Sequence, residues 1–419
     1  MSKVVTIAII GAGARGRGYA RFALAHPERL KVVAVAEPND YYRNQVAEQH
    51  QIAPENCFKS WDEFTQKARM CDAVAICTQD SMHEAPAIAC AGLGYHILLE
   101  KPMAPTPEAC QRIVAAVKKA GVMFAVCHVL RYTRYTEILR QIIASGEIGE
   151  IVSIQHLEPV GYWHQAHSFV RGLWRNEAES SFMLLAKSCH DVDWLRGIMG
   201  KKCTAVHSFG TLRHFKASEK PAGAADRCCD CPVSVESNCP YSANKIYFRD
   251  RLCKGTTVWP VNVLVPDPNA EKLEKALKEG SYGRCVYACD NDVVDNQVVN
   301  MLFEDGSTAS MTMTAFNFNS GRKTRIFGTR GEIDTDSSTI TIRHFLDDST
   351  RVVDTETAND GGILSGHGGG DGGLMNNFVQ AVAENDPSLI LTGIDETLES
   401  HLMVFAAEKS RREGTVCKL

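Results

Sequence analysis

The stretch LLAKSCHDVDWL, residues 184–195, places two side chains that can handle protons inside an otherwise apolar segment. Lys187 and His190 are three residues apart, so on a continuous helix they would share one face, with Trp194 close by. An ammonium group is costly to bury without a partner. We therefore expect this face either to meet solvent or to line a pocket.

A glycine-rich turn after the first apolar run indicates a dinucleotide site. The sequence IIGAGARGRG contains G-x-G-x-x-G as Gly11, Gly13 and Gly16. These glycines allow a tight turn, close approach of backbone amides to a pyrophosphate, and close helix–strand packing. Since the following helix favours phosphates at its N-terminus, Ala14 and Arg15 are also predicted cofactor contacts. A purely structural glycine turn is the alternative.

An acidic residue stands where a dinucleotide-binding unit requires one. Glu37 ends the second β-rich run, about 20 residues after the last motif glycine. Its carboxylate can accept hydrogen bonds from ribose hydroxyls and would repel a 2′-phosphate, so NAD is favoured over NADP. Arg15 and Arg43 could weaken this preference, and a solvated acid at the end of a strand is the alternative.

The order of elements around these motifs predicts an α/β protein of two domains. In residues 1–128, short β-rich runs alternate with amphipathic stretches, which indicates a Rossmann domain, a doubly wound parallel sheet. Residues 129–419 mix the two signals and predict an α+β domain with an antiparallel or mixed sheet and helices on one face. The β runs of the first domain are 4–10, 31–37, 72–77, 95–100 and 123–128.

Four features stand out in the second domain. Asp305 and Gly306 between two β runs indicate a hairpin. Residues 212–290 are rich in Cys, Pro and Lys and are expected to form an insertion. Residues 359–373 form a Gly-rich stretch. Helices are expected over 106–120 in the first domain and over 181–199, 374–384 and 395–413 in the second.

Composition narrows the class of partner. The 419 residues carry a formal net charge of −5 without a long basic run, so nucleic acid is not an expected partner. Neither a signal-peptide pattern nor a membrane-spanning apolar run is visible, so we expect no membrane association and a cytoplasmic location.

The sixteen cysteines include a cluster that could bind metal. Cys228-x-x-Cys231 has a zinc-knuckle spacing. A thiolate zinc site would stabilise a long insertion that has little core of its own. Unligated buried thiols or a disulfide are the alternatives. The predicted structural zinc ligands are Cys228, Cys231, Cys239 and Cys289, with Cys229 or Cys285 as substitutes.

Several motifs together resemble the Gfo/Idh/MocA family, the group of glucose–fructose oxidoreductase, inositol dehydrogenases and rhizopine-catabolism proteins. They are CTQDSMHEAPAIACAGLGYHILLEKP, LLEKPMAPT, VLRYTRY, GEIGEI and CHDVDWLRGIMG, and the resemblance is strongest over the first 200 residues. It implies an open, mostly antiparallel sheet in the second domain, homodimers or homotetramers, and oxidation or reduction of sugars and cyclitols with NAD or NADP.

The resemblance also assigns residues around the nicotinamide. Glu100, Lys101 and Pro102 match the family's E-K-P, whose lysine lies near the nicotinamide and the reacting hydroxyl and whose proline is often cis. The loop after the third strand of the Rossmann domain approaches the same end of the cofactor in the family. Its matching residues are Thr78, Asp80 and His83.

The same resemblance assigns the substrate side. His190 matches the family's catalytic histidine, and Asp193 is the acid of H-x-x-D. Ala186 stands where the family commonly has aspartate, so we expect Lys187 in the K-x-x-H-D form to take its place. Arg131 and Tyr132 match an Arg–aromatic pair that faces the substrate.

Two other stretches could contribute to a substrate pocket. Tyr162, Trp163 and His164 lie in GYWHQAH, and aromatic faces can stack on sugar rings, although an ordinary packed loop is the alternative. The Gly-rich stretch offers His367 and Asp371 to a ligand, with a flexible surface loop as the alternative.

These residues predict an NAD-dependent oxidoreductase that transfers a hydride to or from a secondary hydroxyl of a sugar, glycoside or cyclitol. His190 would be the acid/base, Lys101 would stabilise and position the hydroxyl, and Lys187 would bind substrate or exchange protons. One alternative is a glycosidase in which transient oxidation permits elimination and NAD is recycled. A non-catalytic NAD-binding sensor is the other.

Overall fold

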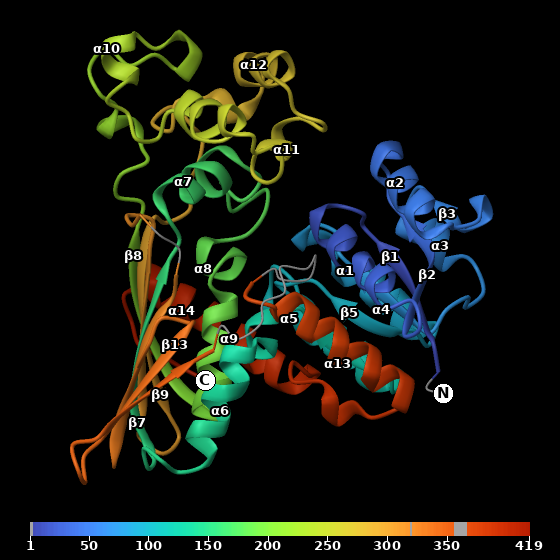
Figure 1. The fold of residues 1–419 in the computed structure, drawn as a ribbon, viewed down its shortest axis with the longest axis vertical. Coiled ribbons are helices and arrows are strands. Elements are labelled where there is room, and N and C mark those ends of the chain that lie inside the picture. The colour runs from blue at the N-terminus through green and yellow to red at the C-terminus, as the bar shows by residue number, and fades with distance from the viewer. Residues whose placement is uncertain (1–2, 319–320, 356–366) are drawn as a thin grey trace.

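The computed structural model describes residues 3–318, 321–355 and 367–419, which build two separate sheets (Figure 1). The first sheet is parallel throughout, in the order β3-β2-β1-β4-β5-β6. The direction of strand order reverses between β1 and β4, where α/β sheets bind ligands. Its strands are β1 (Val5–Ile10), β2 (Leu30–Ala36), β3 (Cys57–Phe58), β4 (Ala73–Ile76), β5 (His96–Leu99) and β6 (Phe124–Val126).

The predicted Rossmann architecture is therefore confirmed, with the two-residue strand β3 as an addition that is too short to give a periodic signal. The helix over 106–120 is also confirmed: it begins after Thr106, whose side chain accepts from Ala109 N–H, and ends at Gly121 with a positive φ. The helices of this part are α1 (Ala14–Ala25), α2 (Asp40–His50), α3 (Trp61–Thr65), α4 (Glu84–Gly92) and α5 (Pro107–Ala120).

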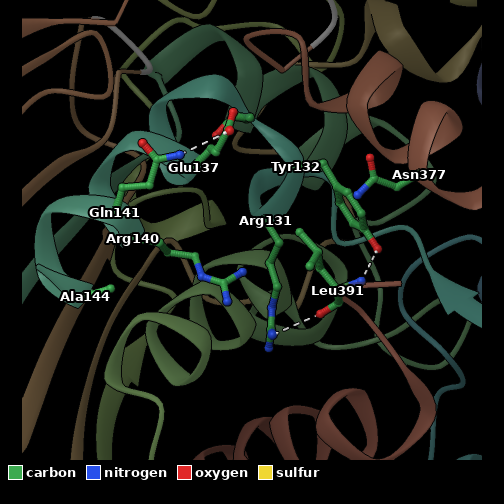
Figure 2. Close-up of a pocket in the computed structure, with 9 residues that line it drawn as sticks. Arg131, Tyr132, Glu137, Arg140, Gln141, Ala144, Asn377 and Leu391 are labelled. Carbon is green, nitrogen blue, oxygen red and sulfur yellow. Dashed lines mark hydrogen bonds between the residues drawn. The ribbon is translucent and has the colours of Figure 1, made fainter. Parts of the chain in front are cut away.

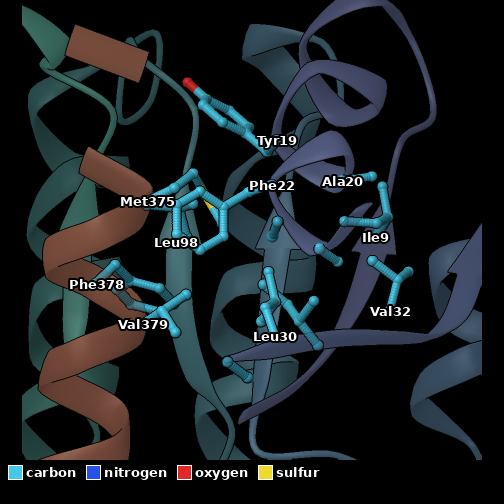
Figure 3. Close-up of a cluster of buried hydrophobic side chains, with 14 of the residues drawn as sticks. Ile9, Tyr19, Ala20, Phe22, Leu30, Val32, Leu98, Met375, Phe378 and Val379 are labelled. Atoms are coloured by element: carbon cyan, nitrogen blue, oxygen red, sulfur yellow. The ribbon is translucent and has the colours of Figure 1, made fainter. Parts of the chain in front are cut away.

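A helix from the far end of the chain, α13 (Gly370–Glu384), completes the core of the first sheet. Figure 3 shows Met375, Phe378 and Val379 of α13 against Phe22 and Leu98. Burying such side chains contributes about 1.5–3 kcal/mol each. Helix α13 therefore shares one hydrophobic core with the first sheet although the two lie far apart in the sequence.

The second sheet has nine strands in the order β14-β13-β12-β11-β7-β10-β9-β8-β15. All its pairs are antiparallel except β7 with β10, so the predicted mostly antiparallel sheet is confirmed. The strands are β7 (Ile151–Pro159), β8 (Cys203–Thr211), β9 (Asn296–Phe303), β10 (Thr308–Thr314), β11 (Lys323–Gly328), β12 (Gly331–Thr335), β13 (Thr339–His344), β14 (Thr350–Asp354) and β15 (Cys417–Lys418).

Helices cover the face of this sheet that is turned toward the first domain (Figure 1). They are α6 (Arg134–Ala144), α9 (Cys189–Met199) and α14 (Ile394–Glu413). Along β9 the buried residues Val299, Met301 and Phe303 alternate with exposed Val298 and Leu302, as expected for a sheet that is covered on one face. The hairpin at Gly306, which has a positive φ, is confirmed.

Residues 212–295, which we call the helical segment, leave the sheet after β8 and return at β9. They lie at one end of the sheet, beyond α7 (Tyr162–His164) (Figure 1). Phe215, Tyr247, Leu273 and Leu277 are buried together here, so the expectation of little core was wrong. The amphipathic helix that supplies the leucines is α12 (Ala270–Glu279), and the shorter helices are α10 (Val233–Glu236) and α11 (Val261–Leu264).

The remaining helical elements are short 3-10 or π turns. They are η1 (Pro54–Asn56), η2 (Asp80–Met82), η3 (Val129–Tyr132), η4 (Gln165–Arg171), η5 (Ala217–Glu219), η6 (Cys228–Asp230), η7 (Asn244–Arg249), η8 (Leu252–Lys254), η9 (Ser281–Gly283) and η10 (Pro387–Leu389). In the described ranges, no helix combines the length and the apolar character that crossing a membrane requires.

The helix expected over 181–199 is in fact two helices, α8 (Met183–Ala186) and α9, with a break at Lys187 and Ser188. Lys187 has φ −112° and ψ −59°, outside regular helix, so Lys187 and His190 do not share one continuous helical face. Trp194 packs in the core and donates from Nε1 to Thr136. Periodicity could not reveal this break because the apolar pattern runs through it.

Candidate active site

The glycine turn joins β1 to α1 with the room that a dinucleotide needs. A Cβ on Gly11 would lie 2.6 Å from Cys77 O, and one on Gly16 would lie 2.0 Å from Gly11 O, so packing requires both glycines. A Cβ on Gly13 would meet nothing within 4 Å. Helix α1 begins there without a side-chain cap or a first-turn acid, which leaves its N–H groups available to an anion. The turn thus fits a pyrophosphate.

Glu37 lies at the end of β2, beside this turn. Its carboxylate accepts hydrogen bonds from Ala12 N–H at 2.7 Å and from Asn39 N–H at 2.9 Å. The oxygen lone pairs that these two bonds leave over can accept from ribose hydroxyls. Arg43 is held by Asp40 and by Glu37 O, so its guanidinium is already engaged.

Arg15 links the glycine turn to two acidic side chains. Its Nε lies 2.6 Å from Glu100 Oε1 and its Nη2 lies 2.7 Å from Asp371 Oδ1. Tyr19 also donates to Glu100. Burial, the largest influence, raises the pKa of Glu100, but the charges of Arg15 and Lys101 outweigh it and hold this pKa below its ordinary value. Glu100 and Asp371 therefore support the turn through Arg15, and the predicted direct cofactor and substrate contacts of these carboxylates have no separate support in this geometry.

The loop after β4 packs firmly against the E-K-P turn. The ring of His83 is fully buried between Pro102 O, 2.7 Å from Nδ1, and Thr78 O, 3.1 Å from Nε2. Asp80 is buried and accepts from Ser181 at 3.2 Å. His83 and Asp80 thus join loops to one another, and the Lys101–Pro102 peptide is cis, as the resemblance implied.

Lys101 reaches from the first domain to the second. Its half-buried Nζ donates to Ala186 O at 2.7 Å, at the end of α8. One N–H of the ammonium is used in this bond, and the other two can bind a ligand oxygen. Lys101 therefore lies where the glycine-turn domain meets the segment that carries Lys187 and His190.

A buried carboxylate holds Lys187 at the break between α8 and α9. Glu158, near the end of β7, lies with Oε1 3.1 Å from Lys187 Nζ and Oε2 2.9 Å from Arg322 Nε. Arg322 also pairs with Asp191 at 2.5 Å, and Asp191 lies 2.9 Å from His156. This chain of alternating charges compensates the buried acids and positions Lys187 as a cation.

His190 is almost fully buried on α9, surrounded by cations and other imidazoles. Burial, and then the charge of Lys101, lower the pKa of His190 well below its ordinary value, with further contributions from His128, His367 and Arg322. Its ring lies 5.6 Å from that of His128 and 6.0 Å from that of His367. The imidazole is therefore neutral at pH 7, with one ring nitrogen able to accept a hydrogen bond from a hydroxyl.

The Gly-rich stretch is described only from His367 onward, so most of residues 359–373 lies outside the described residues. His367 has a positive φ of 53° and its Nδ1 lies 3.3 Å from Asp371 Oδ2. Its ring thus lies near His190, and its predicted contact with a ligand stays a prediction.

His164 brings the aromatic stretch to the same place. Burial, and then the charges of Lys187, His167 and Lys101, lower the pKa of His164 well below its ordinary value. The guanidinium carbon of Arg251 lies over the Trp163 ring, 3.9 Å from its centre. Tyr162 is further out, with its hydroxyl 3.4 Å from Lys245 Nζ. Of the three predicted wall residues, His164 lies nearest the catalytic candidates.

Arg131, Tyr132 and Asp193 have partners within the fold. Arg131 and Asp193 form a buried ion pair at 2.6 Å, and Asp193 also accepts from Ser400. The Tyr132 hydroxyl accepts from Leu391 N–H (Figure 2). Figure 2 shows Arg131 and Tyr132 lining a different pocket of about 510 Å³. The side chains are engaged with one another and with the 391–400 region, and their predicted role toward the substrate stays a prediction.

The predicted zinc centre is not supported. No group of three or more His, Cys, Asp or Glu side chains in the described ranges is placed to hold a metal ion. The Cys228 thiol lies 3.5 Å from the Arg171 guanidinium, and Cys289 donates to Cys285 O at 3.2 Å. Burial raises the pKa of Cys285 and Cys289, which favours neutral thiols. The apolar core of the helical segment supplies the stabilisation that a metal was expected to give. The other predicted ligands, Cys229, Cys231 and Cys239, are free thiols as well.

Three site residues were missed in the sequence: Glu158, Arg322 and His128. Glu158 and His156 share the buried face of β7 with Ile154, so two ionisable residues in phase with an apolar one were an available signal. His128 directly follows β6, and polar residues at carboxyl ends of parallel strands are where ligands bind. Arg322 follows residues 319–320, which the structure does not describe, and nothing in its sequence context marked it.

The arrangement can perform proton-coupled chemistry at a hydroxyl. Two ammonium groups, Lys101 and Lys187, and two neutral imidazoles, His190 and His164, converge beside a turn that fits a dinucleotide phosphate. Ammonium groups stabilise a developing alkoxide, and a neutral imidazole accepts the proton that leaves it.

Comparisons with known proteins show what the fold resembles. The fold matches that of levoglucosan dehydrogenase in complex with NADH and levoglucosan, with a TM-score of 0.70 and 19% identity over 100% of this chain and 99% of that one. It also matches the aldose-aldose oxidoreductase from Caulobacter crescentus complexed with glycerol, with a TM-score of 0.68 and 17% identity over 100% of both chains. At these identities the likeness shows the fold.

In sequence, the chain is similar to 2,7-anhydro-N-acetylneuraminate hydratase of Escherichia coli (strain K12), 27% identical over 49% of this chain and 53% of that protein. It is also similar to myo-inositol 2-dehydrogenase of Thermotoga maritima (strain ATCC 43589 / DSM 3109 / JCM 10099 / NBRC 100826 / MSB8), 25% identical over 46% of this chain and 57% of that protein. The chain thus spans somewhat more than half the length of these curated relatives.

Two family models together cover most of the chain. Residues 5–128 match the oxidoreductase family with an NAD-binding Rossmann fold, and residues 140–419 match the C-terminal alpha/beta domain of the same family. The chain therefore belongs to the Gfo/Idh/MocA oxidoreductase family.

Proposed function

We propose that the protein is an NAD-dependent oxidoreductase that transfers a hydride between a secondary hydroxyl of a sugar, glycoside or cyclitol and the nicotinamide. The observation that carries this proposal is the meeting of Lys101 with the segment of Lys187 and His190 across the two domains. The names of relatives and structural neighbours, which include an inositol dehydrogenase and a levoglucosan dehydrogenase, support the substrate class.

In this proposal Gly11, Gly13 and Gly16 hold the pyrophosphate and Glu37 binds the ribose. Bound NAD supplies the hydride acceptor. The neutral imidazole of His190 takes the hydroxyl proton, and the free N–H groups of Lys101 donate to the oxygen as it gains negative charge. Lys187, fixed by Glu158, binds a neighbouring hydroxyl.

The same proposal favours NAD over NADP. The two arginines near the ribose side are engaged, Arg43 with Asp40 and Arg15 with Glu100 and Asp371. Neither is left to neutralise a 2′-phosphate, which the carboxylate of Glu37 would repel.

The test combines cofactor binding with a substrate panel. The protein is titrated with NAD and NADP, and reduced nicotinamide is followed by its absorbance with sugars, glycosides and inositols. We expect tighter binding of NAD and NADH accumulation with at least one compound. Failure to bind either dinucleotide, or binding without turnover of any compound, would contradict the proposal, and the second result would favour a non-catalytic sensor.

A redox-assisted glycosidase is the second candidate. Elimination after transient oxidation needs another base for the carbon-bound proton, and His164 is a second neutral imidazole beside Lys187. Similarity to a protein named a hydratase also favours a reaction without net redox change. In the same assay, release of the aglycone without NADH accumulation would select this candidate over the dehydrogenase.

A further inference from the structure

The helical segment places one large aromatic side chain beside the candidate active site. Trp259, which lies just before α11, has its ring centre 5.1 Å from that of His164, 5.2 Å from Trp163 and 5.5 Å from His167. The charges of Lys187 and Lys101 lower the pKa of His164, so these lysines lie near His164 as well. His164 therefore connects Trp259 with the lysines of the candidate site.

Trp259 is exposed although three rings contact it. Its exposed fraction is 44%, whereas His167 beside it is buried. Burial of an indole is favourable in free energy, and this indole is left partly open to solvent next to a candidate catalytic group. A ligand ring that packs on the indole would bury it. The indole thus offers a flat apolar surface to whatever extends out of the site.

The stretch that carries Trp259 is held at both sides. On one side Arg251 covers Trp163 at 3.9 Å and donates to Ile246 O at 2.6 Å. On the other side Asp267 lies 3.4 Å from the hydroxyl of Tyr41 on α2. The indole itself packs against the rings of Trp163, His164 and His167, and these contacts limit the conformational freedom that it would lose when a ligand stacks on it.

We propose that Trp259 forms a second sugar subsite, so that the preferred substrate is a glycoside of two rings rather than a monosaccharide. This inference rests on the proposed function: one ring lies at Lys101 and His190, and the ring attached to it stacks on Trp259 beyond His164. A pyranose ring matches this surface because its C–H face packs on the indole, while its hydroxyls remain in solvent or bind the Arg251 region.

The experiment compares matched glycosides in Trp259→Ala, Trp259→Phe and the wild type. Methyl β-D-glucoside, methyl α-D-glucoside and methyl β-D-galactoside are paired with cellobiose, maltose and lactose, and both NADH and released sugar are measured. We expect the wild type to prefer a disaccharide. In Trp259→Ala, kcat/KM for that disaccharide should fall about tenfold while the methyl glycoside value stays unchanged, and Trp259→Phe should restore part of the loss.

Val258→Ala is the matched control, because Val258 is exposed on the same stretch and no aromatic contact involves it. It should leave both substrates unaffected. A wild type that prefers methyl glycosides, or a Trp259→Ala variant that loses equally on both members of a pair or on neither, would overturn the subsite.

A binding measurement separates this proposal from the function on which it rests. The NAD-loaded protein is titrated with the same compounds while tryptophan fluorescence is recorded. If neither these compounds nor the wider panel of sugars, glycosides and inositols is oxidised or cleaved, the proposed function fails, yet disaccharide binding that weakens about tenfold in Trp259→Ala alone would still support the subsite. Equal binding to wild type and variant, or absence of disaccharide binding, would overturn it.

Discussion

At the scale of single residues, the site depends on how a buried carboxylate compensates cations. Ala186 stands where the resemblance implies an aspartate, and its carbonyl oxygen accepts from Lys101. The negative charge comes instead from Glu158 on β7, which lies between Lys187 and Arg322. Position 186 of the sequence shows only that the aspartate is absent. It does not show Glu158, because that carboxylate comes from another element.

Glu158→Gln tests this compensation. Removing the carboxylate leaves Lys187 without its partner and Arg322 with Asp191 alone, so we expect the free energy of unfolding to fall by about 3 kcal/mol. Urea denaturation measures the change. Glu332→Gln is the matched control, since Glu332 pairs with Arg325 and Arg343 at the surface and should cost less than about 1 kcal/mol. Equal losses in the two variants would contradict the assigned role.

Residue identity alone predicted much of the cofactor side and less of the substrate side. The glycine turn and Glu37 follow a pattern of fixed spacing, so a motif finds them even though Gly11 packs against Cys77 and Glu37 accepts from Ala12 N–H. Arg131 and Asp193 carried the right residue types but neutralise one another in the interior. A motif does not show which partner a charged side chain meets.

At the scale of elements, the glycine turn makes the sharpest prediction. Gly13→Ala should fold, because its Cβ would meet nothing within 4 Å, but the methyl group would occupy the space where the pyrophosphate approaches. We expect the affinity for NAD to fall by about tenfold or more. Isothermal titration with NAD measures it.

Two neighbouring glycines on the same stretch give the comparison. Gly18→Ala also meets open space but lies within α1, so its affinity should stay near that of the wild type. Gly16→Ala should lower the thermal midpoint, since its Cβ would lie 2.0 Å from Gly11 O. If Gly13→Ala binds NAD as the wild type does, the dinucleotide does not lie over this turn.

Element types followed from periodicity, whereas breaks and long-range partners did not. The helix expected over 181–199 is interrupted at Lys187, where Glu158 on a neighbouring strand fixes the side chain. Helix α13 was expected, but its packing against the first sheet depends on contacts with residues that are hundreds of positions earlier. Local patterns carry no information on such contacts.

At the scale of the whole molecule, buried neutral histidines link stability to pH. Burial is the largest cause that lowers the pKa of His167 and of His401, each to about 3. Between about pH 6.5 and pH 3 the unfolded chain therefore binds more protons than the folded one, so the free energy of unfolding rises with pH. Folding stability is thus lost as the solution is acidified through this window.

From pH 7.5 to pH 5.5 these two histidines should together lower the free energy of unfolding by about 3 kcal/mol. Urea denaturation at the two pH values measures it. His401→Gln should remove about half of the contribution of these two histidines, whatever its effect on stability at pH 7.5. Stability that is flat or increases on acidification would contradict the assignment of these histidines as neutral.

The uncovered face of the nine-stranded sheet bears on assembly. Val152, Phe209, Leu302 and Val416 are exposed large apolar side chains on its strands or beside them. Apolar side chains gathered on one face are typical of contacts between copies of a chain. The homodimer or homotetramer expected from the resemblance stays a prediction. This face is the surface through which the copies would make contact.

The most direct test of the account is hydride transfer in His190→Gln. With the substrate that the panel identifies, NADH formation or product release should fall by about a hundredfold or more, while NAD affinity stays within about twofold of the wild type. His26→Gln, at a surface histidine of the same chain, should be unaffected. Turnover by His190→Gln at a rate close to that of the wild type would contradict the claim that this imidazole handles the proton.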